Sequence, residues 1–104
     1  MRNPPTNEEL AQIPRLETTK SEKVENRRMY DIYRLQNKSW YVAEYSPETR
    51  TFYGYVVDHK HLEKGAWEYF SLDGLLRLRN EWGTEVIADS YHGAPRIHVP
   101  AGRT

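Results

Sequence analysis

The sequence contains no cysteine among its 104 residues. Disulfide scaffolds, cysteine-ligated zinc sites, iron–sulfur clusters and cysteine nucleophiles are therefore excluded. The chain also lacks an apolar run of the roughly 20 residues that a membrane-spanning helix needs. Its first residues, Met1–Pro5, include no apolar segment typical of a secretory signal. We expect a cytoplasmic protein with no membrane association.

The chain has no excess of charge of either sign, with 15 Lys and Arg against 15 Asp and Glu. Both halves are balanced, so no basic segment is present to displace counterions from a nucleic acid. Glycine-rich phosphate loops, a Gly-x-Ser-x-Gly elbow and a recognisable pair of catalytic carboxylates are also absent. These absences disfavour nucleic-acid binding and most enzyme classes, and we predict no catalytic residue, cofactor or metal.

Aromatic residues are plentiful: eight Tyr, three Trp and two Phe make up 12% of the chain. Disordered chains are poor in aromatic residues, so the sequence predicts a folded core. The length fits one small domain. We divide the chain into a polar arm at 1–27, a core domain at 28–91 and an extended tail at 92–104.

The arm carries a capping box, with Thr6 as the N-cap and Glu9 three residues later. A short helix is predicted over 7–13, where Pro14 ends it. Apolar residues are few, so we expect the arm to dock loosely on the domain or to bind a partner. The charged residues 17–27 are predicted to form a loop.

From Arg28 onward, apolar and polar residues alternate with a period of two, which is typical of half-buried strands. Short loops separate consecutive segments, and such loops join antiparallel neighbours. The predicted strands are 29–35, 39–45, 51–57, 67–70 and a fifth at 84–89.

One longer helix is predicted over 72–82, starting after a capping serine. Leu75, Leu78 and Trp82 recur at helical spacing and would form one buried stripe. Gly83 occupies the position of a helix-ending glycine.

These elements predict an α+β fold: an antiparallel meander sheet of four to five strands, packed on one face by the single amphipathic helix at about 72–82, with a short N-terminal helix. One helix covers one face of such a sheet, so the other face should be open to solvent or to a partner. The strand at 29–35 is a candidate for an unpaired edge, through which two copies could form a homodimer.

Tyrosines concentrate in the predicted strands. On the third strand, Tyr53 and Tyr55 alternate with Phe52 and Val56, which have the character of a core. We therefore expect Tyr53 and Tyr55 on the open face, where rigid rings are typical of protein-binding surfaces, although the strand propensity of Tyr also explains them. Gly54 predicts a bulge or a ring lying over bare backbone. The candidate binding residues are Tyr53, Tyr55, Tyr41, Tyr45, Trp40, Glu44, Arg34 and Arg50.

Glu44 lies among aromatic residues of the second predicted strand. Regular alternation would place it on one face with Trp40, and Tyr45 on the other. A carboxylate beside an indole can be buried with a raised pKa, which is how a general acid or base is made. A cross-strand pair with Arg34, Arg50 or a tyrosine hydroxyl is the structural alternative, and both interpretations stay open.

His59 and His61 are two residues apart, with Asp58 and Glu63 beside them. On a strand this spacing would put both imidazoles on one face, a geometry that can hold zinc. They fall in a predicted loop between strands, so a solvated polar loop is the favoured interpretation.

A series of short motifs spans residues 13–91: Ile13–Leu16, Trp40–Tyr41, Glu44–Tyr45, Phe52 with Gly54 and Val56, Tyr69–Leu72 with Leu75, and Glu85–Asp89. The run Tyr-Phe-Ser-Leu is the most specific of them. Together the motifs resemble the domain of unknown function numbered 2958, a family of small proteins from bacterial plasmids, phages and other mobile elements. The resemblance implies a mobile-element setting and no known activity.

Three functions follow from these expectations. The first is a non-enzymatic accessory protein of a mobile element that binds or inhibits another protein through its Tyr-rich sheet face. The second is a regulator that stacks single-stranded bases on the same face, helped by Arg28, Arg34 and Arg50. The third is a small enzyme centred on Glu44.

Overall fold

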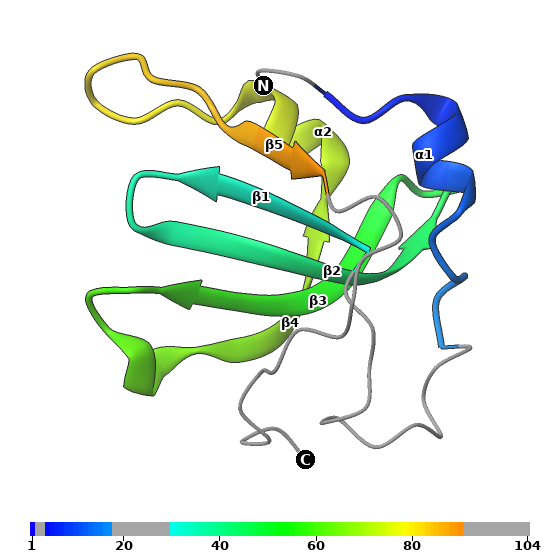
Figure 1. Ribbon diagram of the computed structural model, residues 1–104, viewed down its shortest axis with the longest axis horizontal. Coiled ribbons are helices and arrows are strands. Elements are labelled where there is room, and N and C mark those ends of the chain that lie inside the picture. Colours follow the sequence, from blue (N-terminus) through cyan, green and yellow to red (C-terminus); the bar gives the residue numbers. More distant parts are fainter. Residues whose placement is uncertain (2–3, 18–29, 91–104) are drawn as a thin grey trace.

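The computed structural model describes residue 1, residues 4–17 and residues 30–90, with only the backbone of the last two. The strands in this part of the chain form a five-stranded antiparallel sheet in the order β4-β3-β2-β1-β5, accompanied by two short α-helices (Figure 1). The predicted α+β meander fold is thereby confirmed. The elements are α1 (Asn7–Ala11), β1 (Asp31–Leu35), β2 (Lys38–Ser46), β3 (Thr51–Asp58), the 3₁₀ turn η2 (Leu62–Lys64), β4 (Ala66–Ser71), α2 (Leu72–Arg77) and β5 (Ile87–Ser90). The predicted loop beyond residue 17 and the predicted tail at 92–104 lie outside the described residues.

Helix α1 begins where the capping box predicts it and ends at Ala11, two residues before the predicted end at 13. The Glu9 amide donates a hydrogen bond to the Thr6 hydroxyl (3.1 Å), and the Thr6 amide donates one to the Glu9 carboxylate (2.8 Å). Leu10 on the helix and Ile13 just after it are buried in the main core. The prediction of a loosely docked arm is therefore wrong for this segment, because these two apolar side chains anchor it on the sheet.

Strands β1 to β4 follow one another as a meander, and β5 returns to pair with β1. Tyr33 of β1 lies opposite Trp40 of β2 on one side and opposite Ala88 of β5 on the other. The prediction of a free edge at 29–35 is wrong, because the segment after α2 supplies a strand on that side. The edges of the described sheet are β4 and β5.

Strand β2 contains a β-bulge. Val42 lies opposite Gly54. The next paired residue is Glu44, which lies opposite Tyr53, so the residue between Val42 and Glu44 is an extra one. Gly54 is necessary at this point because a Cβ there would overlap the Tyr41 carbonyl oxygen. Of the two predictions for this glycine, the bulge is confirmed.

The bulge changes which side chains of β2 share a face. Beyond it, Tyr45 lies opposite Phe52 and joins the main core, on the same side as Trp40. Glu44 faces the other side. The predicted alternation, which grouped Glu44 with Trp40 and separated both from Tyr45, is therefore wrong, because one inserted residue inverts the order of the faces.

Helix α2 begins where predicted and ends early. The Ser71 hydroxyl caps it by accepting a hydrogen bond from the Gly74 amide (3.0 Å). After Arg77 the backbone is extended, with φ −66° and ψ 132° at Leu78. The helix predicted over 72–82 is therefore wrong beyond residue 77.

The predicted stripe on this helix forms only in part. Leu75 is buried, but Leu78 and Trp82 are exposed. The physical reason is a competing turn: Arg79 pairs with Glu85 as an antiparallel bridge, which draws the chain out of the helical path. Among the described residues, no helix is long and apolar enough to cross a membrane.

The main core lies between the two helices and one face of the sheet. At its centre, Phe52 contacts the rings of Tyr33, Tyr45 and Phe70 at centroid distances of 5.4, 4.7 and 5.4 Å. Phe52 and Val56 of β3 thus face the core, as predicted. The buried members are Leu10, Ile13, Tyr33, Trp40, Val42, Tyr45, Phe52, Val56, Leu72, Leu75, Val86 and Ala88.

Tyr33 is fully buried in this core beside an acidic residue. Its hydroxyl donates a hydrogen bond to the Asp31 carboxylate (2.9 Å), which also accepts one from the Ile32 amide (3.2 Å). Burial raises the pKa of the Tyr33 hydroxyl far above its usual value, and the Asp31 carboxylate raises it further. Each polar group of the pair has a partner, as buried polar groups require.

The other face of the sheet carries a second buried cluster. Tyr53 and Tyr55, 9% and 5% exposed, pack on the Trp67 ring at centroid distances of 5.5 and 5.9 Å. The expectation that this face is open, with the two tyrosines available for docking, is wrong. The cluster consists of Ala43, Tyr53, Tyr55, Val57 and Trp67, with Leu16 and Tyr41 partly buried against it.

Two segments far apart in the sequence contact this second cluster. The chain after α1 reaches β2, where the Tyr45 amide donates to the Pro14 carbonyl (2.8 Å), and Leu16 then packs on the cluster. The loop before β4 covers another part: a side chain at Gly65 would overlap the Tyr55 hydroxyl, so the loop backbone lies directly on that ring. These contacts explain why the face is not open.

Candidate functional site

The predicted binding residues do not form one surface. Tyr53 and Tyr55 are buried in the second cluster, and Trp40 belongs to the main core. Tyr41 is half-buried, and Arg34 is exposed on the same side of the sheet. Aromatic rings on both faces stabilise the fold, so the Tyr-rich docking face predicted from the sequence does not form.

Glu44 is a buried acidic residue at the bulge, 3% exposed. Its Oε1 accepts a hydrogen bond from the Glu17 amide (2.8 Å). This bond holds the segment after α1, including Leu16, over the second cluster. Arg50, one of the cross-strand partners considered for Glu44, pairs instead with Asp73 (2.9 Å). The contacts give Glu44 a role in attaching the N-terminal segment to the sheet.

The two histidines do not meet in a metal site. Among the residues that the structure describes, no group of three His, Asp or Glu side chains is placed to hold a metal ion. His61 Nδ1 lies 3.8 Å from the Glu63 carboxylate, and His59 Nε2 lies 3.0 Å from the Ser39 hydroxyl. A Ser–His contact can begin a nucleophilic site, but Ser39 is only 2% exposed, so its hydroxyl is out of reach of a substrate.

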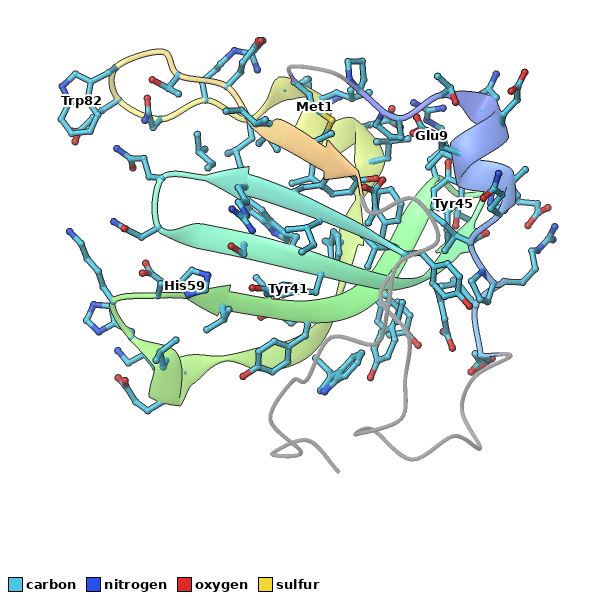
Figure 2. The ribbon with its side chains drawn as sticks, in the orientation of Figure 1. Met1, Glu9, Tyr41, Tyr45, His59 and Trp82 are labelled. Carbon is cyan, nitrogen blue, oxygen red and sulfur yellow. The ribbon has the colours of Figure 1, made fainter. Side chains whose placement is uncertain are left out.

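A pocket of about 370 Å³ opens between α1 and the turn that joins β2 to β3. It brings together two of the predicted binding residues, Tyr45 and Arg50. Tyr45 lies at the end of the sheet next to α1 (Figure 2). The lining residues are Asn7, Leu10, Ala11, Ile13, Arg15, Tyr45, Pro47 and Arg50.

Both arginines of this pocket form exposed ion pairs. Arg15 Nη2 donates to the Glu48 carboxylate (2.7 Å), and Arg50 Nε donates to the Asp73 carboxylate (2.9 Å). A guanidinium has five N–H donors, of which Asp73 takes one. No other described residue accepts a hydrogen bond from Arg50, so its two Nη groups are available to a ligand.

Tyr45 is one of the residues that line the pocket, and it is 3% exposed. Burial raises the pKa of its hydroxyl; the nearby Arg50 guanidinium opposes the rise and the Asp73 carboxylate adds to it. The hydroxyl forms no hydrogen bond with another described residue. Tyr45 is therefore neutral at physiological pH.

Trp82 is the most exposed large apolar residue of the described part, at 72%. It lies in the turn between α2 and β5, at the end of the molecule away from Tyr45 (Figure 2). Asn80 holds this turn: its Oδ1 accepts hydrogen bonds from the Trp82 and Thr84 amides, both 2.9 Å. The backbone carbonyl of Asn80 accepts a third hydrogen bond, from the Gly83 amide (3.0 Å). Its backbone amide donates a fourth, to the Thr84 carbonyl (3.1 Å).

The base of this turn is also fixed. Arg79 and Glu85 form a backbone bridge, and their charged groups are 3.2 Å apart. Leu78 and Ile87, which flank the turn in the sequence, are each 38% exposed. Residues 79–85, here named the Trp82 turn, therefore form a short rigid ribbon that presents an indole.

Sequence reasoning missed most of both features. The pocket residues Asn7, Ala11 and Arg15 come from the arm that was expected to be loose. Trp82 was assigned to a buried helical stripe. The sequence did contain one signal for the turn: Asn80 and Gly83 lie three residues apart, and both residue types are typical of turns.

Comparisons with known proteins add no assignment to this geometry. No family model matches the chain, and neither a curated protein nor a solved structure matches it. The resemblance to the domain of unknown function numbered 2958 therefore rests on the short motifs alone, and the function must be argued from the two surface features.

Proposed function

We propose that the protein is a non-enzymatic binding module that recognises another protein through the Trp82 turn. The observation that carries this proposal is the 72% exposure of Trp82 on a turn that four hydrogen bonds of Asn80 hold in place. The family resemblance adds the setting, a plasmid, phage or other mobile element of a bacterium.

An exposed indole on a hydrogen-bonded turn is well suited to binding. Trp is enriched among the few residues that supply most of the energy at protein interfaces. Burying roughly 150 Å² of its surface would contribute about 4 kcal/mol at about 25 cal/mol per Å². Hydrogen bonds already hold the backbone of the turn, so the ordering that opposes this gain is mainly that of the Trp82 side chain.

The surroundings of Trp82 indicate the chemistry of the partner. Leu78 and Ile87 add apolar surface near the base of the turn. The Glu85 carboxylate pairs with both the Arg79 guanidinium (3.2 Å) and the Met1 ammonium (3.5 Å). Glu81, next to Trp82, is a second exposed acid, so the charges around the turn balance. A partner protein with a neutral, apolar pocket that accepts an indole therefore fits this surface better than a strongly charged one.

The two other functions considered have less support. Stacking of single-stranded bases needs open rings, whereas the central tyrosines of the sheet are buried. Arg34 lies on β1 and Arg50 on the turn between β2 and β3, and Arg28 lies outside the described residues. An enzyme centred on Glu44 needs a carboxylate that reaches a substrate, and Glu44 is buried and bonded to a backbone amide.

Affinity capture with the full chain tests the proposal. Unmodified protein, Trp82→Ala and Leu62→Ala serve as baits for a bacterial extract, and captured proteins are identified by mass spectrometry. Leu62 is a matched control because it is also apolar and exposed, in the loop before β4. The captured partner is then purified and its affinity measured by calorimetry. We expect Trp82→Ala to weaken binding about 30-fold, the roughly 2 kcal/mol of a dominant interface residue, and Leu62→Ala to have no effect.

The control for folding is urea unfolding followed by circular dichroism. Replacing the exposed Trp82 should change the free energy of unfolding by less than about 0.5 kcal/mol. A partner that Trp82→Ala retains at full affinity would contradict the assignment of binding to this turn. Self-association that disappears in Trp82→Ala, measured by sedimentation, would show that the surface binds a second copy instead.

A further inference from the structure

The pocket between α1 and the β2–β3 turn has the size and lining of a small-molecule site. Its volume of about 370 Å³ lies at the lower end of the range for such sites, roughly 300–1,000 Å³. Leu10, Ile13, Pro47 and the Tyr45 ring give it an apolar lining. A site of this size takes one ring or one branched chain rather than an extended polymer.

The polar groups of the pocket are suited to an anion. Two arginines line it, whereas no acidic side chain of the described residues does. Asp73 occupies only the Nε of Arg50 (2.9 Å), which leaves both Nη groups to bind a ligand. The Asn7 side-chain amide is a further donor.

We propose that this pocket binds a small carboxylate with an apolar body, such as an aromatic or branched aliphatic acid. The body packs against Leu10, Ile13 and the Tyr45 ring, and the carboxylate accepts hydrogen bonds from Arg50. Guanidinium and carboxylate groups form two parallel, charge-assisted hydrogen bonds, which neutral groups do not match. Tyr45, which lines the pocket, and Trp82 lie at opposite ends of the molecule (Figure 2), so either assignment can fail without the other.

Phenylacetate and phenylacetamide test the proposal, because they share a ring and nearly the same shape and differ in charge. Binding to the full chain is followed by two-dimensional nitrogen–proton NMR, in which saturable shifts of the amide signals of Leu10, Ala11 and Tyr45 report the pocket. We expect phenylacetate to bind at least tenfold more tightly than phenylacetamide, about 1.4 kcal/mol. Equal affinities, or the absence of saturable shifts at millimolar phenylacetate, would overturn the proposal.

Three substitutions test the role of Arg50. Arg50→Gln should weaken phenylacetate binding at least tenfold. Asp73→Asn removes the acid that competes for the same guanidinium, so the affinity should stay the same or rise. Arg77→Gln removes an exposed cation of α2 that does not line the pocket, and it should have no effect. A dispersed NMR spectrum confirms the fold of each variant. If Arg50→Gln and Arg77→Gln weakened phenylacetate binding equally, the loss would come from the change in overall charge rather than from a contact with Arg50, and the proposed site would be wrong.

A carboxylate close to a phenyl ring also occurs at the C-terminus of a peptide whose last residue is Phe. Competition between phenylacetate and N-acetyl-Gly-Phe, with its amidated form as control, distinguishes the two sources. Displacement by the free peptide at the concentrations at which phenylacetate binds would identify a peptide terminus as the ligand. Failure to displace phenylacetate would identify a free acid, the source that the small volume of the pocket favours.

Discussion

Removing a ring from the second aromatic cluster should cause a large loss of stability. Tyr55→Ala deletes a phenol from a position that is 5% exposed and that contacts the Trp67 ring edge-on at 5.9 Å. A buried aromatic side chain removes roughly 150–250 Å² from water, an upper bound of roughly 4–6 kcal/mol at about 25 cal/mol per Å². Losses for aromatic-to-alanine changes in cores are about 3–5 kcal/mol, which is the range we expect for Tyr55→Ala.

The matched control is Tyr69→Ala, because Tyr69 lies on the same face but is 59% exposed. Its ring contacts Tyr53 at 4.8 Å, so we expect a loss of at most about 1 kcal/mol. Urea unfolding of both variants is followed by circular dichroism at room temperature. With a slope of about 1.5 kcal/mol per M, Tyr55→Ala should lower the midpoint by about 2 M or more, and Tyr69→Ala by less than about 0.7 M.

Equal midpoints for Tyr55→Ala and Tyr69→Ala would refute the burial of Tyr55. That result would mean that this face of the sheet is open in solution, as a docking surface would be. Tyr53→Ala repeats the test at a second position, because Tyr53 is also buried and stacks on Trp67 at 5.5 Å. We expect Tyr53→Ala and Tyr55→Ala to cost similar amounts.

Two further perturbations test other parts of the fold. Gly54→Ala should lower the free energy of unfolding by about 3 kcal/mol, because a Cβ there would overlap the Tyr41 carbonyl. Gly74→Ala, whose Cβ would meet nothing closer than 3.6 Å, should raise it by about 0.5–1 kcal/mol through helix propensity. Urea unfolding measures both effects, and equal effects would contradict the bulge geometry. The raised pKa of Tyr33 means that the folded protein keeps this proton to a higher pH than the unfolded chain does. Its contribution to stability is therefore complete below about pH 10 and falls above it by up to about 1.4 kcal/mol per pH unit. In Tyr33→Phe the free energy of unfolding should not show this additional decrease above about pH 10. If the free energy of unfolding changed with pH in the same way in both proteins, the Tyr33 hydroxyl would not be the cause of the decrease.

Local patterns predicted the elements whose periodicity is uninterrupted. Strand β3 has no inserted residue, so the alternation of Phe52 and Val56 with the tyrosines identified its core side correctly. The capping residues Thr6 and Ser71 likewise marked the starts of both helices, because a side-chain oxygen satisfies amides that the first turn leaves unpaired.

Strand β2 shows where the same reasoning fails. A prediction from alternation assumes that no residue is inserted in the strand. The bulge inserts one, so Glu44 and Tyr45 lie on the faces opposite to those predicted. The only local signal was Gly54, which the bulge requires and which a ring packed over bare backbone would explain equally well. The error reached the site, because Tyr45 lines the pocket and Glu44 does not.

The end of α2 depended on a competition that spacing does not reveal. Leu75, Leu78 and Trp82 fit a helical stripe, yet Asn80 stabilises a turn that removes the last two from it. The prediction that Gly83 ends the helix is wrong, because α2 ends at Arg77, although Gly83 does have a positive φ of 78°. It closes the turn rather than the helix, because the turn gains four hydrogen bonds on Asn80 that a continued helix would lack.

The abundance of aromatic residues is a poor guide to function in this chain, whereas the exposure of one of them is a better guide. Hydrophobic residues make up only 38% of the sequence, and the two short helices contribute three buried residues to the main core, Leu10, Leu72 and Leu75. Tyrosines therefore supply buried area on both faces of the sheet, and the need for a core accounts for Tyr53 and Tyr55 without any partner. Trp82 has no such explanation, since most of its surface lies in water. Stability and binding should thus separate by residue: Tyr55→Ala should unfold the protein at lower urea, and Trp82→Ala should leave the midpoint in place while partner binding weakens about 30-fold. A large drop in stability for Trp82→Ala would instead require contacts of the indole within the fold, and it would remove the reason for assigning binding to this residue.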